Sequence, residues 1–371
     1  MPNFCAHEAV MDQDHPQSTL ESGAETGTVL MRDVAELAGV AISTVSRALT
    51  QPDRVSKKTR DRIMAAAAQI GYTPNAVAQN LRRGSSRMMM IVLPGPLMGG
   101  ASQIVPAVLE GVAAALTAEG FNLMVANLDR SEAVERHILD LAYGGTIAGA
   151  LTLASFLPAQ GARSLTAAGL PLVGILQDVS DQGVPSVVTN DRAAMAAAVQ
   201  QLLDLGHRRF MYIAAPPGNY HEYQRFGGVL DALREAGLDA RAVTRVEAGD
   251  SFLMGLQAGA IAAERFAAMA PQGRPTAILG SSDDAAIAFI GAAARLGLRV
   301  PEDVSVVGFD GSAVGAHTIP PLTTIAQPAR AMGERAAYML LEQARGGALP
   351  PLVTLDSRLI LRGSIAAAPA I

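Results

Sequence analysis

The chain has 371 residues, half of them hydrophobic, which is enough for two or three compact units. No apolar run reaches the roughly 20 residues that a membrane-spanning helix needs, and no basic start precedes an apolar block, so neither a membrane span nor a secretory signal is predicted. Cys5 is the only cysteine, which excludes an intrachain disulfide and favours a reducing, cytoplasmic location.

The net charge of −5 is distributed unevenly along the chain. Residues 1–27 contain five acids and no Lys or Arg, whereas residues 28–87 contain ten basic and four acidic residues, and the remainder is acidic. A basic segment on an acidic body is typical of a protein that approaches a polyanion from one end. A solvated basic face without a partner is the alternative.

The first 27 residues show no hydrophobic period, so we predict a disordered extension there. Residues 30–50 predict a helix, a glycine turn and a second helix. Val34 and Leu37 give the first helix an apolar face, and Gly39 suits a left-handed turn. Val45 and Leu49 form the apolar face of the second helix.

The opposite face of this second helix is small and polar, with Ser43, Thr44, Ser46 and Arg47. Hydroxyls and a guanidinium on such a face can enter a major groove and bond base edges and phosphates. Two amphipathic helices of an ordinary small bundle are the alternative.

A third helix is predicted over residues 56–70, with Ser56 as its N-cap and Gly71 at its end. Pro74 suits the start of a short helix that runs to Leu81, and a basic, glycine- and serine-containing exit follows. We therefore expect four parts: an extension over 1–27, a helix-turn-helix domain over 28–73, a hinge helix and linker over 74–87, and a body over 88–371.

The body alternates short apolar runs with alanine-rich helical stretches. The predicted strands are 88–93, 121–126, 148–153 and 171–176, followed by a second series at 209–214, 242–246, 276–279 and 304–308. The predicted helices are 103–118, 131–142, 160–168, 222–236, 252–269 and 283–296. This alternation is typical of doubly wound parallel sheets, so we expect an all-α headpiece and an α/β body of two lobes. Ligands bind such sheets beyond the carboxyl ends of the strands, where the lobes face each other.

Motifs in both parts resemble the lactose-repressor (LacI/GalR) family of bacterial transcription regulators. The headpiece motifs are Asp33-Val34-Ala35, Ala38-Gly39-Val40, Thr44-Val45-Ser46-Arg47 and Gly71-Tyr72-x-Pro74-Asn75. The body motifs include Leu205-Gly206-His207-Arg208-Arg209, Arg225-x-x-Gly228, Val307-Gly308-Phe309-Asp310 and Pro320-Pro321-Leu322-Thr323-Thr324. The resemblance covers about residues 28–364 and implies a sequence-specific regulator, a repressor whose body resembles periplasmic binding proteins.

Carried over by position, the resemblance implies DNA-binding residues on the second helix, at its flanks and in the hinge. They are Met31, Ile42, Ser43, Thr44, Ser46, Arg47, Arg54, Ser56, Thr59, Asn75, Leu81 and Arg82. Leu81 matches a hinge leucine that wedges into the minor groove, and neighbouring arginines suit a narrowed backbone there. Leu30 and Ala41 replace capping residues usual in the family, and Ile42 offers a base edge only apolar contact.

The resemblance also implies an effector site between the lobes. Arg225 and Asp310 fall where the family bonds ligand hydroxyls or carboxylates, and a guanidinium and a carboxylate suit those roles. The further candidates are Ser102, Asn190, Asp191, His221, Tyr223, Ser282 and Asp283. Salt bridges or helix caps are the alternative role for Arg225 and Asp310. The effector is expected to be a sugar, and Arg225 and His221 together suggest a sugar acid as a second candidate class.

The implied partners are palindromic operator DNA, a sugar or sugar-acid effector, and a second copy of the chain in a homodimer or tetramer. We expect a cytoplasmic, nucleoid-associated protein with no cofactor and no metal. A sugar-binding receptor without a transcriptional role is the alternative. An enzyme is not predicted, because no catalytic motif or metal-spaced Cys/His cluster is present.

Overall fold

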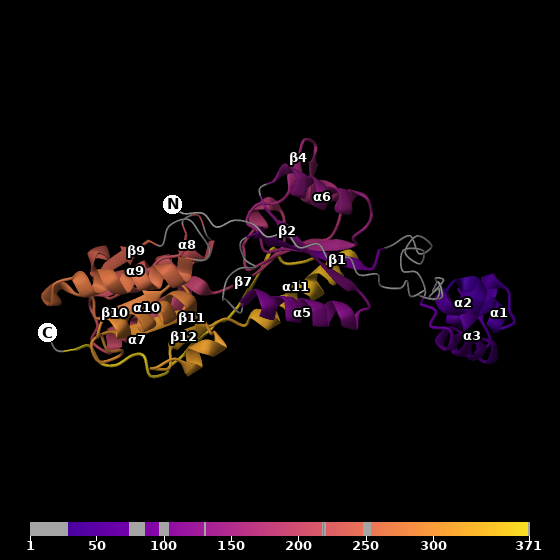
Figure 1. Cartoon of the computed structure of the whole chain (residues 1–371). Coiled ribbons are helices and arrows are strands. Elements are labelled where there is room, and N and C mark those ends of the chain that lie inside the picture. The colour runs from indigo at the N-terminus through magenta and orange to yellow at the C-terminus, as the bar shows by residue number, and fades with distance from the viewer. Residues whose placement is uncertain are drawn as a thin grey trace, which may run out of the picture. The chain divides into compact units, whose positions relative to one another are not determined.

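The structure is a computed structural model that describes residues 29–73, 86–95, 104–129, 131–216, 218, 220–247 and 254–369. The chain divides into two compact units, residues 1–83 and 84–371 (Figure 1). The predicted extension over 1–27 and the predicted hinge helix up to Leu81 lie outside the described residues.

The described residues of the first unit form α1 (Met31–Leu37), α2 (Ile42–Thr50), α3 (Lys57–Gln69) and the short 3-10 helix η1 (Pro52–Arg54). Gly39, in the turn between α1 and α2, has a φ of +60°, as the predicted left-handed turn requires. The Ser56 hydroxyl caps α3 by accepting from the Thr59 N–H at 3.3 Å. Neither Leu30 nor Ala41 caps its helix with a side chain, but the Asp33 carboxylate accepts from the Leu30 N–H at 2.7 Å.

The core of this unit forms where the three helices meet around Val34, Val45 and Ile63, which are fully buried. The expectation that Leu37 belongs to this core is wrong, because its side chain is 46% exposed. The buried face of α1 is centred on Val34, Ala35 and Ala38, and position 37 falls at the edge of that stripe.

The second unit has two lobes, each built around a six-stranded sheet. The sheet of lobe 1 is parallel throughout, in the order β13-β7-β6-β3-β1-β2. Its strands are β1 (Met88–Pro94), β2 (Asn122–Leu128), β3 (Gly149–Thr152), β6 (Leu172–Ile175), β7 (Ser186–Thr189) and β13 (Leu352–Leu355). Helices α5 (Ile104–Ala118) and α11 (Ala329–Ala344) cover one face, and α6 (Glu132–Tyr143) covers the other (Figure 1).

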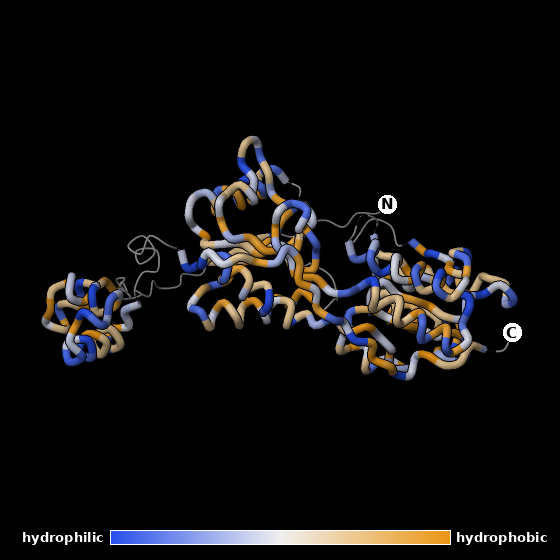
Figure 2. Tube along the Cα trace, turned by 180° about the vertical axis from the view of Figure 1, so that it is seen from behind, coloured by the Kyte–Doolittle hydropathy of each residue, from blue (hydrophilic) through white to orange (hydrophobic). Residues whose placement is uncertain are grey.

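The sheet of lobe 2 has the order β14-β12-β11-β10-β8-β9, and only β14 is antiparallel to its neighbour. Its strands are β8 (Phe210–Ile213), β9 (Val243–Val246), β10 (Ala277–Gly280), β11 (Ser305–Asp310), β12 (Thr323–Ala326) and β14 (Arg358–Ile360). Helices α7 (Asp191–Asp204) and α8 (Tyr220–Glu235) cover one face, and α9 (Met254–Ala268) and α10 (Asp283–Arg295) cover the other. Figure 2 shows the hydrophobic strands lying inside each lobe.

The predicted strand–helix alternation and the two lobes are confirmed, but one predicted helix is wrong. In place of the predicted helix over 160–168, residues 159–168 form a hairpin of β4 (Ala159–Gln160) and β5 (Arg163–Ser164) and the 3-10 helix η3 (Thr166–Ala168). Gly161 in the hairpin turn has a φ of +59°, a conformation that interrupts a helix.

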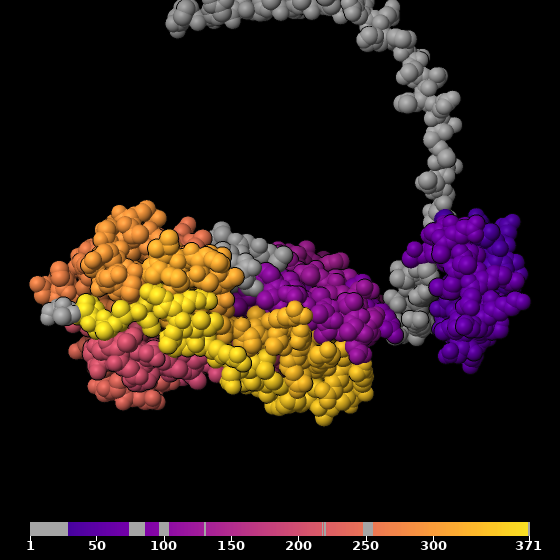
Figure 3. Space-filling view, turned by 90° about the horizontal axis from the view of Figure 1, so that it is seen from below, coloured from indigo at the N-terminus to yellow at the C-terminus, as the bar shows by residue number. Residues whose placement is uncertain are grey.

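Within the described residues of the body, the chain passes between the lobes three times, after Thr189, Ala326 and Leu355. The sequence patterns assign no element to residues 186–204 or 323–360, and so they miss the return of α11 and β13 to lobe 1. The C-terminal segment, yellow in Figure 3, runs along the surface over both lobes. The Asn190 amide ties two crossings together, since its Nδ2 donates to Asp356 at 2.9 Å and its Oδ1 accepts from the Ser357 N–H at 2.9 Å.

Candidate DNA-binding face and ligand cavity

The polar face of α2 lies at the surface of the headpiece. Ile42, Ser43 and Arg47 are exposed and Ser46 is partly buried, whereas Val45 and Ala48 on the opposite face are buried. The helix therefore presents the side chains expected to enter a major groove on one accessible face. Ile42 is 53% exposed, an apolar side chain that suits contact with a thymine methyl.

The other candidate DNA-binding residues of the headpiece differ in how exposed their side chains are. Arg54 and Ser56 are exposed, Thr59 is partly buried, and the Ser56 and Thr59 hydroxyls lie 2.9 Å apart. Thr44 and Met31 are also partly buried. Asn75, Leu81, Arg82 and Ser102 lie outside the described residues, so their contacts stay predictions.

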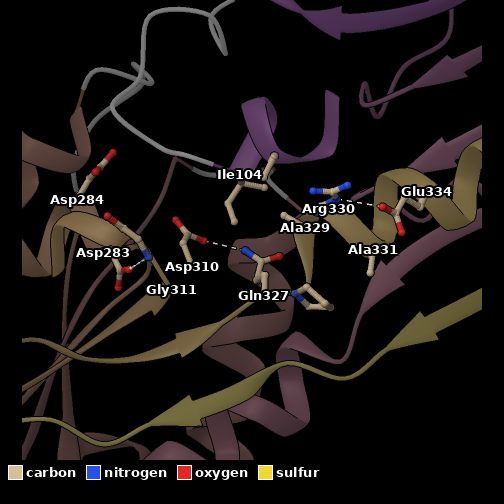
Figure 4. Close-up of a pocket in the computed structure, with 13 residues that line it drawn as sticks. Ile104, Asp283, Asp284, Asp310, Gly311, Gln327, Ala329, Arg330, Ala331 and Glu334 are labelled. Atoms are coloured by element: carbon tan, nitrogen blue, oxygen red, sulfur yellow. Dashed lines mark hydrogen bonds and ion pairs between the residues drawn. The ribbon is translucent and has the colours of Figure 1, made fainter. Parts of the chain in front are cut away.

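A cavity of about 500 Å³ lies where the two lobes meet (Figure 4). Helix α5 contributes Ile104 and Ala107, and lobe 2 contributes carboxylates after β10 and at the end of β11. The remaining wall comes from the second crossing and the start of α11. The described lining residues are Ile104, Ala107, Asp283, Asp284, Asp310, Gly311, Ser312, Gln327, Pro328, Ala329, Arg330, Ala331 and Glu334.

Beside this cavity the structure brings together Asp191, His221, Arg225 and Asp310. The Arg225 Nε donates to Asp191 at 2.9 Å, and its Nη1 lies 3.5 Å from an Asp310 oxygen. The same Nη1 donates to the Ser281 carbonyl at 2.5 Å. The guanidinium carbon stands 3.7 Å from the ring centroid of Phe309. Arg225 is thus a buried cation whose donors are largely used inside the protein, and it does not line the cavity.

The buried carboxyls near Arg225 differ in pKa. Burial alone would raise the pKa of Asp191, but the charges of Arg225 and His221 outweigh burial and hold that pKa far below its usual range. Burial raises the pKa of Asp310 to about 7, because Arg225 and the Gln327 amide only partly offset it and Asp283 opposes ionisation. Burial likewise raises the pKa of Asp283 to about 6. The cavity wall therefore holds two carboxyls that titrate near neutral pH.

The remaining effector candidates lie in three different settings. The His221 Nδ1 lies 2.8 Å from Asp191, so this ring belongs to the buried cluster. Tyr223 is 71% exposed and lies outside the cavity lining. The Ser282 hydroxyl caps α10 by accepting from the Ala285 N–H, and Asn190 is used at the lobe crossings.

Sequence reasoning missed Gln327, whose amide Nε2 donates to Asp310 at 2.7 Å and which lines the cavity (Figure 4). The only signal was local: Gln327 follows the Leu322-Thr323-Thr324 motif and precedes a proline, a position typical of the end of a strand. Thr189, which donates its hydroxyl proton to Asp191, was missed as well.

A helix-turn-helix unit and a two-lobed α/β unit with a ligand-sized cavity define a DNA-binding transcriptional regulator. Residues 30–75 match the profile of the bacterial regulatory proteins of the lacI family, and residues 199–365 match the periplasmic binding protein-like domain. The chain is 33% identical over 342 residues to the HTH-type transcriptional repressor CytR of Escherichia coli (strain K12), covering 91% of this chain and 97% of the relative. The chain belongs to the lacI family of bacterial regulatory proteins.

Solved structures match most of this chain. The lac repressor dimer bound to operator and the anti-inducer ONPF superposes with a TM-score of 0.76 at 28% identity, covering 91% of this chain and 99% of that one. A complex of the transcriptional regulator CelR with cellobiose gives a TM-score of 0.64 at 29% identity over the same shares. Within the described part of this chain, no helix is long and apolar enough to cross a membrane, and no cluster of potential ligands could hold a metal ion.

Proposed function

We propose that this chain is a transcriptional repressor that binds a palindromic operator as a homodimer and responds to a neutral sugar held between its lobes. The observation that carries the proposal is the cavity, whose volume is in the range of small-molecule sites and whose lining is rich in hydrogen-bond acceptors. Carboxylates accept hydrogen bonds from sugar hydroxyls, and apolar side chains such as Ile104 suit the faces of a sugar ring.

The charges around the cavity favour a neutral sugar over a sugar acid. The described lining residues include four carboxyls, those of Asp283, Asp284, Asp310 and Glu334, and one cation, Arg330, which already bonds Glu334 at 3.0 Å. The two groups that suggest an anionic ligand in the sequence, Arg225 and His221, both contact Asp191. An anionic ligand would therefore meet repulsion without a free cation among the described lining residues.

The DNA-binding part of the proposal depends on the exposed face of α2, with Arg47 as its guanidinium donor. We further propose that a sugar in the cavity shifts the closure of the lobes and so changes operator affinity. Such a regulator acts in the cytoplasm, at the nucleoid, and turns over no substrate.

A thermal-shift screen tests the ligand class, because a ligand that binds only the folded state raises its stability with occupancy. Cellobiose, D-ribose and D-glucose represent neutral sugars, and gluconate, glucuronate and glucose 6-phosphate represent anions. At least one neutral sugar is expected to raise the unfolding temperature, and the anions are not. Stabilisation by anions alone would refute the neutral-sugar assignment, and stabilisation by none would refute the effector role of the cavity for these classes.

Two variants test whether a sugar that raises the unfolding temperature binds in this cavity. Asp310→Asn should reduce stabilisation by the active sugar, whereas Glu132→Gln, at an 80% exposed side chain on α6, should leave it unchanged. DNA binding is tested by selecting genomic fragments with the full chain. A chain that binds sugar but selects no sequence would support the receptor alternative.

A further inference from the structure

Gln327 lies on the second crossing between the lobes, one residue after β12 of lobe 2 and two residues before α11 of lobe 1. Its backbone N–H donates to the Asp310 carbonyl at 3.2 Å, and its side-chain amide donates to the Asp310 carboxyl at 2.7 Å. The Thr189 hydroxyl, at the end of β7 where the first crossing begins, lies 3.4 Å from the Gln327 Oε1. One side chain therefore joins a cavity carboxyl to the segments that connect the lobes.

The Asp310 carboxyl is held in place against an unfavourable backbone. Asp310 has a φ of 124°, a region that non-glycine residues rarely adopt, so its conformation persists only because surrounding contacts enforce it. The groups that act on this carboxyl come from four places: Arg225 on α8, Asp283 on α10, Asp191 on α7, and Gln327 on the crossing. Gln327 lies two residues before α11 of lobe 1, and Asp191 lies two residues after β7 of lobe 1. Of these two, Gln327 is the one that lines the cavity.

Beyond Gln327, lobe 1 is packed so that α11 and α5 must move together. A side-chain carbon at Gly333 of α11 would lie 2.2 Å from the Val108 carbonyl, and one at Gly111 of α5 would lie 2.1 Å from the Arg330 carbonyl. The two helix backbones are thus in direct contact at reciprocal glycines. A displacement of the start of α11 is transmitted to α5, whose residue Ile104 lines the same cavity.

We propose that Gln327 is the positioning residue that couples ligand occupancy at Asp310 to the arrangement of α11 and α5. A ligand hydroxyl that bonds Asp310 changes the carboxyl's bond to the Gln327 amide, and the crossing carries that change into lobe 1. This inference rests on the proposed function, because it assigns a route for the response to the ligand in the same cavity. Gln327 acts through Asp310 and the crossing rather than by chemistry of its own.

The test uses the full chain with Gln327→Met, which keeps the side-chain length and the backbone hydrogen bond but removes the amide. Gln343→Met is the matched control, because Gln343 lies on α11, the helix that follows Gln327, and its Oε1 accepts from the Leu172 N–H at 3.0 Å within lobe 1. Cellobiose, D-ribose and D-glucose are the probes. Hydrogen–deuterium exchange of residues 104–118 and 329–344 is followed with and without each sugar.

In the wild type and in Gln343→Met, the sugar that stabilises the chain in the thermal-shift screen is expected to change hydrogen–deuterium exchange in both α5 and α11. In Gln327→Met, the sugar should still bind, with affinity about tenfold lower, but the exchange change in α5 and α11 should be lost. A Gln327→Met chain that binds the sugar and shows the wild-type exchange change would overturn the inference and leave the proposed function intact.

A second readout needs no ligand. The Gln327 amide favours the ionised Asp310 carboxyl, so its removal should move the pH at which that carboxyl titrates upward by about one pH unit. The pH dependence of unfolding should shift accordingly in Gln327→Met and not in Gln343→Met. If no sugar stabilises the wild type but this shift occurs, the sugar proposal fails and the Asp310–Gln327 link stands. If the shift is absent, the link itself is refuted.

Discussion

Replacing Asp310 with asparagine should change how the stability of the body depends on pH. Burial raises the pKa of this carboxyl from its usual value to about 7, so the folded chain retains a proton that the unfolded chain releases near pH 4. The stability contributed by the protonated form is complete below the unfolded-state pKa and is lost as pH rises through about 7. Asparagine keeps the shape of the side chain at position 310 but has no carboxyl group that can gain or lose a proton.

The size of the effect follows from the two pKa values. From about pH 5 to about pH 7 the free energy of unfolding falls by about 1.4 kcal/mol for each pH unit. The total loss between about pH 5 and about pH 8 is therefore roughly 3 kcal/mol. The free energy of unfolding of the wild type, measured relative to Asp310→Asn, should fall by that amount across the range.

Urea unfolding followed by circular dichroism at constant ionic strength measures this difference. Glu132→Gln, a change at an exposed carboxylate, should follow the wild type at every pH. A constant difference between wild type and Asp310→Asn would mean that Asp310 is ionised throughout, and the reasoning from burial would be refuted.

Three further outcomes are expected. Arg47→Ala should weaken operator binding by about 1–3 kcal/mol and relax sequence preference, which footprinting on selected fragments measures; an unchanged footprint would exclude α2 as the recognition helix. Ile63→Ala should destabilise the headpiece by about 2–5 kcal/mol because Ile63 is fully buried, while Met64→Ala, half-exposed, should cost far less; equal losses in thermal unfolding would contradict the assigned core. Gly111→Ala should destabilise lobe 1 by about 1–3 kcal/mol, because its methyl group would overlap the backbone of α11, whereas Gly291→Ala on α10, near only a flexible side chain, should be neutral or stabilising; a stable Gly111→Ala chain would argue against the close helix contact.

The headpiece could be predicted from the sequence because its signals are local. Gly39 marks a turn between two short helices, Ser56 marks a helix start, and the spacing of Val45 and Leu49 marks the apolar face of the second helix. Leu37 was misplaced for the same reason: spacing along one helix indicates a stripe but not where a neighbouring helix centres its contact.

The body could be predicted only in part. Strands that are buried on both faces can be recognised in the sequence as continuous apolar runs. The alternation of strands and helices and the presence of two α/β lobes could therefore be predicted. The hairpin at residues 159–164 was not recognised, because a two-residue strand has too short a pattern to distinguish it from a helix.

The amino-acid sequence by itself determined the class of the protein, its helix-turn-helix and the candidate residues Arg225 and Asp310. Only the tertiary structure decided which groups those residues contact. It paired Arg225 with Asp191, which is 34 positions away, and it placed Gln327 between Asp310 and Thr189, which is 138 positions from it. Local propensity carries no information about such distances. The partners of a buried charge depend on how the chain crosses between lobes, and that is settled when the sheets assemble.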